Sequence, residues 1–294
     1  IWPGFLFCAV MGLFLTYIDR KVSARVQYRI GPGWYQPFAD VLKLLAKQTF
    51  LPQGGSATIF LLGPCLAITS VTIVGMMLFS MNLQPSRSFA GDLIVLIYLL
   101  ALVPLGVILG ASASRNPVAA VGASREMTLY FAYELPLVIA LLVPVVQTNS
   151  LRIGTMVLWQ QQHHAVLYSF SGAIAAAIAL VCMQAKLGLP PFDIAEAEQE
   201  LMAGPLVEYS GAALALYRLA RAMLTLLLPI FFITVFWGGI ANVWAFPKFL
   251  LIFGLMVLAK NTNPRIRIDQ ALRLFWIGLS PVAAAAVVLA LLGA

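Results

Sequence analysis

Long apolar runs separated by short polar connectors dominate this sequence and constrain its fold more than any other feature. A run of about 20 apolar residues can cross a bilayer as an α-helix, whereas the strands of a membrane barrel are about half as long and alternate in polarity. The pattern therefore predicts an all-α, polytopic integral membrane protein with about eight transmembrane helices. We expect spans over residues 2–18, 59–81, 92–113, 126–146, 166–185, 211–237, 243–259 and 272–293.

The composition excludes several other classes of protein. Hydrophobic residues make up 62% of the 294 residues and charged residues 10%, whereas a soluble domain carries about 25% charged residues. The chain is therefore not a soluble globular enzyme, a disordered protein or a secreted disulfide scaffold. No repeat or linker interrupts it, so we expect a single membrane domain over residues 1–294. Because Ile1 lies inside an apolar run, we expect a trimmed start without a cleavable signal.

Basic residues are concentrated on one side of the expected spans. Of the 18 Lys and Arg residues, 15 fall on that side and 3 on the other, and the formal net charge is +7. The positive-inside rule explains this asymmetry without a nucleic-acid partner and assigns the basic side to the cytoplasm. Both termini are then expected on the non-cytoplasmic side.

Two loops on the basic side, at about 19–58 and 184–210, are longer than simple connectors. Within the first, residues 36–47 combine helical periodicity with charges on one face. This pattern predicts an interfacial amphipathic helix or a helix covered by a partner subunit.

The second loop is rich in carboxylates. Pro190 and Pro191 stop the preceding span and can open a new helix, so we expect Asp193 at its N-cap or in its first turn. Like charges on one helix face repel and raise each other's pKa. We expect Asp193, Glu196 and Glu200 to share such a face, although a solvated acidic loop fits the pattern equally well. Five of the 11 acidic residues fall within 16 positions here: Asp193, Glu196, Glu198, Glu200 and Glu208.

Glu134 lies inside an apolar span, two residues before Pro136. A carboxylate in hydrocarbon costs roughly 2.5–3.5 kcal/mol on insertion scales, so such residues usually serve proton or ion passage. The alternative is a carboxylate near the interface that pairs with Arg125 or Lys186. Glu126, at the start of the same span, is expected to snorkel or cap.

No residues indicate a metal site or a catalytic centre within this chain. Cys8, Cys65 and Cys182 are far apart, and His163 and His164 are adjacent in a polar loop, so neither set has metal-ligand spacing. Walker, GxSxG, HExxH and dinucleotide fingerprints are absent from the sequence.

Several polar motifs follow one another along the chain. They are Asp19-Arg-Lys with Arg25, Gln27-Tyr-Arg-Ile-Gly-Pro32, Gln36-Pro-Phe-Ala-Asp-Val-Leu-Lys43, Gly122-Ala-Ser-Arg125, Tyr133-Glu-Leu-Pro136, Leu189-Pro-Pro-Phe-Asp-Ile-Ala-Glu-Ala-Glu-Gln-Glu-Leu201, Glu208-Tyr-Ser-Gly211 and Asn263-Pro-Arg-Ile-Arg-Ile-Asp269. In this order the motifs resemble the NuoH-type family of complex I membrane subunits over nearly the whole chain.

The family has two large branches. In respiratory complex I this subunit helps to form the quinone chamber, and the other branch holds the energy-converting (group 4) NiFe hydrogenases and formate hydrogenlyase. Only Gly33-Trp-Tyr35 stands where complex I members usually carry a longer insert, and Lys47-Gln48 stands where they often have Lys-Glu. The stretches 122–126 and 198–205 also resemble the hydrogenase branch, which we therefore favour.

The resemblance implies a non-redox membrane subunit of a redox-driven ion pump. It would anchor a peripheral NiFe hydrogenase-type electron-transfer module and couple it to proton or cation translocation in a prokaryotic cytoplasmic membrane. The implied partners are large and small hydrogenase-like peripheral subunits, an iron–sulfur protein and antiporter-like membrane subunits. The NiFe centre and the iron–sulfur clusters are expected in those partners, with no cofactor in this chain.

The resemblance also implies roles for named residues. Proton or ion coupling is implied for Glu134, Asp193, Glu196, Glu198, Glu200 and Glu208. Docking of partners or charge balance is implied for Asp19, Arg20, Arg25, Arg29, Asp40, Lys43, Arg125 and Lys186.

Three other functions are weighed against this one. A quinone-chamber subunit of a complex I-type NAD(P)H- or other-donor:quinone oxidoreductase would be marked by quinone reduction. A stand-alone secondary transporter would be favoured by inverted repeats, which we do not find. A purely structural anchor predicts that neutralising Glu134 or Glu200 leaves coupling intact.

Overall fold

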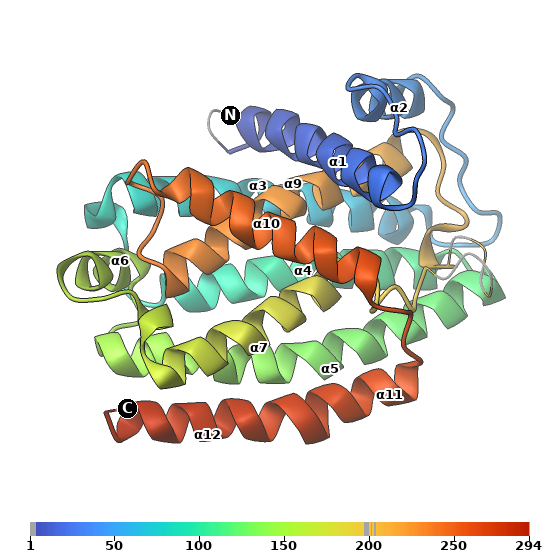
Figure 1. The fold of residues 1–294 in the computed structure, drawn as a ribbon. Helices are drawn as coiled ribbons and strands as arrows, with labels where there is room; N and C mark the ends of the chain where they lie inside the picture. The colour runs from blue at the N-terminus through green and yellow to red at the C-terminus, as the bar shows by residue number, and fades with distance from the viewer. Residues whose placement is uncertain (1–3, 197–199, 201, 203, 294) are drawn as a thin grey trace.

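The part of the chain that the computed structural model describes, residues 4–196, 200, 202 and 204–293, consists of helices packed side by side and joined by loops (Figure 1). The longer helices are α1 (Leu6–Val26), α2 (Gln36–Leu45), α3 (Ala57–Leu83), α4 (Asp92–Ala113), α5 (Pro117–Thr148), α6 (Ile153–Gln162), α7 (Phe170–Lys186), α9 (Gly211–Phe236), α10 (Ala245–Thr262), α11 (Ile268–Arg273) and α12 (Ser280–Leu291). Short helical turns are η1 (Pro85–Arg87), η2 (Val166–Tyr168), η3 (Gly204–Leu206) and the π-helical η4 (Leu274–Leu279).

Within the described residues, each expected membrane span overlaps a helix or a joined helical run, but the span expected over 166–185 is interrupted at Ser169, between η2 and α7. Among the described residues, six runs are long and apolar enough to cross a membrane: α3, α4, α5, α9, α10 and the joined α11–η4–α12. Helix α7 is apolar but shorter, with 17 residues. Helix α1 continues through the charged stretch Asp19-Arg-Lys to Val26. The polytopic all-α membrane fold predicted from the sequence is thus confirmed.

The first long loop contains the predicted helix, α2. Pro37 and Val41 are its buried residues, and Val41 packs with Leu13 of α1 and Ala222 of α9. Leu42 on its other face is exposed. Helix α2 therefore lies across the ends of α1 and α9 with an apolar face outward.

Helix α6 was not expected from the sequence. It has ten residues, and its first backbone N–H, at Ile153, donates to the Asp92 carboxylate of α4 at 2.8 Å. A helix this short is marginal without tertiary contacts. The acceptor that caps it lies 61 residues earlier in the chain, so local pattern could not reveal it.

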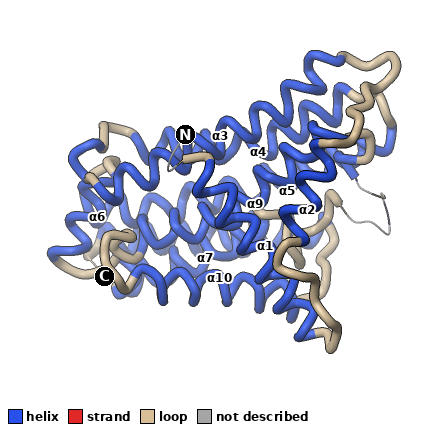
Figure 2. The backbone as a smooth tube through the Cα atoms, turned by 90° about the horizontal axis from the view of Figure 1, so that it is seen from above, coloured by secondary structure: helices blue, strands red, loops and turns tan. Residues whose placement is uncertain are grey.

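Helix α9 lies at the centre of the bundle, with other helices on every side (Figures 1 and 2). Its buried positions run from Gly211 to Phe236 and pack against α1 and α3. Gly12 of α1 makes the closest approach, since a Cβ there would lie 2.3 Å from the carbonyl oxygen of Ala222. The two backbones can touch only because residue 12 has no side chain.

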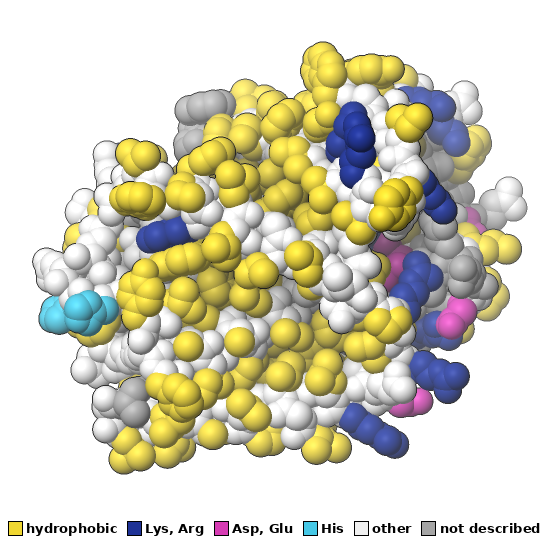
Figure 3. Space-filling model, in the orientation of Figure 1, with side chains coloured by type: hydrophobic (Ala, Val, Ile, Leu, Met, Phe, Trp, Pro, Cys, Tyr) yellow, Lys and Arg dark blue, Asp and Glu magenta, His cyan; other side chains and the backbone are white. Residues whose placement is uncertain are grey.

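Charged side chains gather at one end of the molecule. In Figure 3 most of the Lys, Arg, Asp and Glu side chains in view cluster over the end that carries α2 and α11, while the two histidines and one basic side chain lie toward the other end. The surface between the two ends is largely apolar, as a bilayer-facing surface must be. The charged end holds the two long loops and is the place to look for a site.

Replacing Gly12 by Ala should separate α1 from α9. A Cβ there meets fixed backbone, so we expect the free energy of unfolding to fall by about 1–3 kcal/mol. Gly254→Ala in α10 is the matched control, because a Cβ at Gly254 has no neighbour within 4 Å. Thermal unfolding of the solubilised protein tests this, and equal midpoints for the two variants would contradict the close approach.

Candidate functional site

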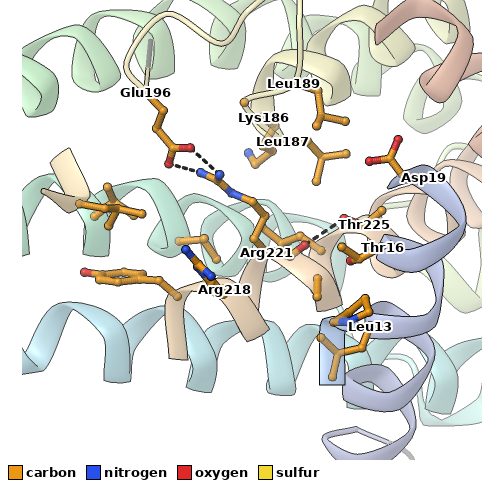
Figure 4. Close-up of a pocket in the computed structure, with 18 of the residues that line it drawn as sticks. Leu13, Thr16, Asp19, Lys186, Leu187, Leu189, Glu196, Arg218, Arg221 and Thr225 are labelled. Carbon is orange, nitrogen blue, oxygen red and sulfur yellow. Dashed lines mark hydrogen bonds and ion pairs between the residues drawn. The ribbon is translucent and has the colours of Figure 1, made fainter. Parts of the chain in front are cut away.

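A cavity of about 490 Å³ opens at the charged end, between α1, α2, α4, α5, α9, α10 and the loop that follows α7 (Figure 4). Apolar side chains such as Leu13 and Val107 form part of its wall. The charged residues that line it are Asp19, Asp40, Glu126, Glu196, Arg20, Lys186, Arg218 and Arg221. Acids and bases are therefore equal in number among the described residues around this space.

Glu134 and Lys186 form an ion pair inside the helix bundle. The Lys186 Nζ lies 2.9 Å from Glu134 Oε2, and the two side chains are 1% (Lys186) and 16% (Glu134) exposed. Lys186 is the last residue of α7 and also lies 5.4 Å from the centre of the Tyr133 ring. The alternative to ion passage named Arg125 or Lys186 as the partner of Glu134, and the structure shows the pairing with Lys186. Since Lys186 also lines the cavity, the pair connects the cavity to Glu134 in the middle of helix α5.

Each described carboxylate of the acidic loop between residues 193 and 200 pairs with an arginine from a different element. Asp193 accepts from Arg265 at 2.7 Å, in the connector between α10 and α11. Glu196 accepts from both terminal nitrogens of Arg221 in α9, one of them at 2.6 Å (Figure 4). Glu200 accepts from Arg125 in α5 at 2.6 Å. Glu198 lies outside the described residues.

The helix expected to begin near Asp193 is not found there. Residues 187–196 form turns and irregular backbone, so the expectation that Asp193, Glu196 and Glu200 share one helix face is wrong. Phe192 and Ile194 are buried at 3% and 7% exposure. Because these side chains are buried, the loop is held against the bundle without forming a helix at Asp193. Its three described carboxylates are each neutralised by a separate arginine.

The environments of Asp193 and Glu196 shift their pKa values in opposite directions. Burial raises the pKa of Asp193, with the charge of Arg265 opposing this shift and that of Glu196 adding to it. Burial acts the same way on Glu196, but Arg221, by charge and hydrogen bonding, and Arg218 together hold its pKa below the usual value. Asp193 therefore takes up a proton more readily than its neighbour.

Glu208 and the residues of the first loop occupy separate contacts. Glu208 accepts a hydrogen bond from the Asn116 side chain, which also caps α5. Asp19 pairs with Lys260 at 2.6 Å. Arg20 pairs with Asp40 at 3.0 Å, which joins α1 to α2. Arg25, Arg29 and Lys43 are exposed and take part in none of the ion pairs that the described residues form.

Three residues of the site were not chosen from the sequence. Arg218 and Arg221 lie about two turns inside α9, and Glu126 lines the same cavity rather than only capping α5. The criterion that singled out Glu134, an ionisable residue inside an apolar span, applies equally to the two arginines. In the part of the chain that the structure describes, no group of three His, Cys, Asp or Glu side chains could hold a metal ion.

Glu196→Gln should lower stability at neutral pH, whereas Asp193→Asn should not. The lowered folded pKa means that ionised Glu196 stabilises the fold at neutral pH, and this contribution is lost as the pH falls below about 4.3 through the folded value. The raised folded pKa of Asp193 means that its ionised form costs stability once the pH rises above about 3.9.

We therefore expect Glu196→Gln to lower the unfolding midpoint at neutral pH, with a deficit that shrinks on acidification. Asp193→Asn should be neutral or stabilising at neutral pH. Midpoints measured between about pH 4 and about pH 8 span both effects. A deficit of the same sign in both variants at neutral pH would contradict the assignment.

Comparisons with known proteins agree with this architecture. A family model described as NADH dehydrogenase matches residues 3–291. The NuoH-type subunit of NADH-quinone oxidoreductase from Geobacillus sp. (strain WCH70) is 35% identical over 296 residues, covering 92% of this chain and 86% of the relative. A chain of the membrane-bound sulfane sulfur reductase, described as an archaeal respiratory membrane complex, has a TM-score of 0.87 and 28% identity, covering 97% of this chain and 96% of that chain. These matches confirm the resemblance to NuoH-type subunits: the chain belongs to the NADH dehydrogenase family.

Proposed function

We propose that this chain is the membrane anchor and coupling subunit of a multisubunit redox-driven ion pump. It links a peripheral NiFe hydrogenase-type electron-transfer module to proton or cation translocation. The observation that carries the proposal is the buried Glu134–Lys186 pair beside a cavity that the acidic loop lines through Glu196. A purely structural subunit has no need of a charged pair at that depth, because apolar residues would pack there at lower cost.

The carboxylates proposed for coupling differ in their exposure to solvent. The Glu200 side chain is 63% exposed, that of Glu196 is 23% exposed and that of Glu134 is 16% exposed. Each carboxylate pairs with a basic side chain. Protonation of one carboxylate would therefore weaken its ion pair, and the basic side chain that it releases could then interact with another carboxylate. A change in charge at a docked redox module would shift the protonation of the outer members first.

The first loop offers a surface for the redox partners. Arg25, Arg29 and Lys43 are exposed basic residues, and Trp34 and Leu42 are 65% and 66% exposed in the same loop. Such mixed basic and aromatic surfaces suit protein interfaces. The large and small peripheral subunits and their iron–sulfur protein, which would hold the NiFe centre and the clusters, dock here under the proposal. Antiporter-like subunits would contact the apolar sides of the bundle.

The charge distribution supports an orientation of the subunit in a prokaryotic cytoplasmic membrane. The end that carries α2 and the acidic loop faces the cytoplasm, because the basic residues gather there (Figure 3). Both termini then lie on the other side. This orientation places the cavity mouth toward soluble redox partners.

The cavity favours a second candidate, a quinone-chamber subunit. Its volume of about 490 Å³ lies within the range of small-molecule sites, and its wall combines apolar and charged side chains. A quinone headgroup would find the Tyr209 ring and Arg218 along this wall, with apolar contacts from Val103 and Leu214. The bound quinone would accept electrons that the redox module delivers.

Glu134→Gln tests the coupling role. Removing the charge breaks the pair with Lys186. We therefore expect the number of ions translocated per electron pair to fall about fivefold or more, which corresponds to the lower end of typical coupling free energies. Redox turnover should persist. The assay uses the native complex in proteoliposomes, with Asp269→Asn, an exposed carboxylate of α11, as the matched control. An unchanged ratio in Glu134→Gln would support the structural anchor.

The identity of the redox module can be tested on the complex purified through a tag on this chain. We expect nickel in the complex and hydrogen evolution from a low-potential donor. Quinone reduction without nickel would instead support the quinone-chamber function. A chain that purifies without redox partners would contradict both and favour a transporter.

A further inference from the structure

The last membrane run contains a segment that its function as an anchor does not explain. Between α11 and α12 the six residues of η4 form a π-helix, in which the backbone N–H of Ser280 donates to the carbonyl of Phe275. The Ser280 hydroxyl donates to the same carbonyl at 2.8 Å. π-Helical turns are rare and often mark functional sites.

Phe275 is the one buried residue of this turn. Its side chain is 0% exposed, whereas Trp276 and Ile277 beside it are 53% and 74% exposed. The π turn therefore buries one ring fully and Leu279 in part against the core, while Trp276 and Ile277 on its other face are exposed. A turn held mainly through one ring can change its winding at modest cost.

That ring lies between the two halves of the proposed coupling site. On one side its centre is 5.1 Å from the ring of Phe192, which directly precedes Asp193 in the acidic loop. On the other side it is 6.5 Å from the ring of Tyr133, which precedes Glu134 and carries Lys186 over its face. Both distances lie within the range of interacting aromatic pairs.

The acidic loop and the segment leading into η4 are also tied together. Arg265 pairs with Asp193, and the backbone N–H of Ile266 donates to the Pro191 carbonyl at 3.1 Å. A displacement of the loop must therefore reach the start of α11 as well as the ring of Phe192. Phe275 receives both movements and transmits them to Tyr133.

We propose that Phe275, set on the π turn η4, is a positioning residue that links the acidic loop to the Glu134–Lys186 pair. Movement of the loop shifts Phe275 against the ring of Tyr133. This shift changes the contact between the Tyr133 ring and the Lys186 ammonium group, and so the strength of the ion pair between Lys186 and Glu134. The inference rests on the proposed coupling function and deepens it.

Phe275→Ala in the reconstituted native complex tests the link. We expect redox turnover to be retained, while ions translocated per electron pair fall about twofold or more, as for residues along a coupling network. Phe275→Met, which refills much of the volume, should restore part of the ratio. The matched control is Phe236→Ala in α9, which removes another fully buried ring that contacts Phe232 and not the acidic loop.

A double-mutant cycle separates transmission from general loss of packing. Phe192→Ala and Phe275→Ala should be non-additive in their effect on the ratio, while Phe192→Ala and Phe236→Ala should be additive. Deleting Ile277 removes one residue from the π turn and should lower the ratio while the complex still assembles. If that deletion prevents assembly, Ser280→Ala provides the milder change, with a smaller loss in the same direction.

The outcomes distinguish this inference from the function on which it rests. Equal effects of Phe275→Ala and Phe236→Ala, or additivity with Phe192→Ala, would overturn the role of Phe275. An unchanged ratio in the π-turn variants would overturn the role of η4. If Glu134→Gln lowers the ratio and Phe275→Ala does not, the inference fails and the coupling function stands. If Glu134→Gln leaves the ratio unchanged, the coupling function fails.

Discussion

Charge inside a bilayer must be paired, and the arrangement of this molecule follows from that requirement. Placing an ionised side chain in hydrocarbon is costly, and leaving it there without a partner costs more. Five of the six ion pairs of the described residues join elements at the charged end, the Glu134–Lys186 pair lies inside the bundle, and each pair joins groups at least 20 positions apart in the sequence. The pairs thus act as tertiary contacts where apolar packing gives way to loops.

Helix α9 brings most of these contacts together. Its central position lets Arg218 and Arg221 enter the cavity from one side, while its first residues hold the end of the first loop. The Thr49 hydroxyl accepts from the backbone of Ala212, and Ser210 accepts from the backbone of Phe50. Two hydrogen bonds therefore fasten the two long loops to each other at the start of the same helix.

The sequence predicted the helices well because length and hydrophobicity are local properties. The spans, helix α2 and the cavity carboxylates other than Glu126 were recognisable from pattern. Glu134 could be singled out, but the choice between Arg125 and Lys186 as its partner needed the packing of α5 against α7. The helix expected at Asp193 failed because local rules weigh Pro191 and the carboxylates but not the burial of Phe192.

Other features depended on contacts that no local pattern contains. Helix α6 depends on Asp92, and the balance of charge around the cavity depends on arginines that a positive-inside count treats as ordinary loop residues. The π turn at Leu274–Leu279 likewise has no recognisable motif. In most of these cases the missing information was a contact between residues that lie far apart in the sequence.

The pair between Arg20 and Asp40 has an evolutionary consequence. It closes the chain between α1 and α2 into a loop of fixed span, and Val41 anchors the far side against α9. The turn at Gly31–Gly33 inside that loop can therefore lengthen or shorten without displacing α2. Each doubling of a flexible loop costs only about 0.6 kcal/mol in closure entropy. Insertions and deletions between relatives can accumulate at this turn, while the cavity behind it keeps its shape.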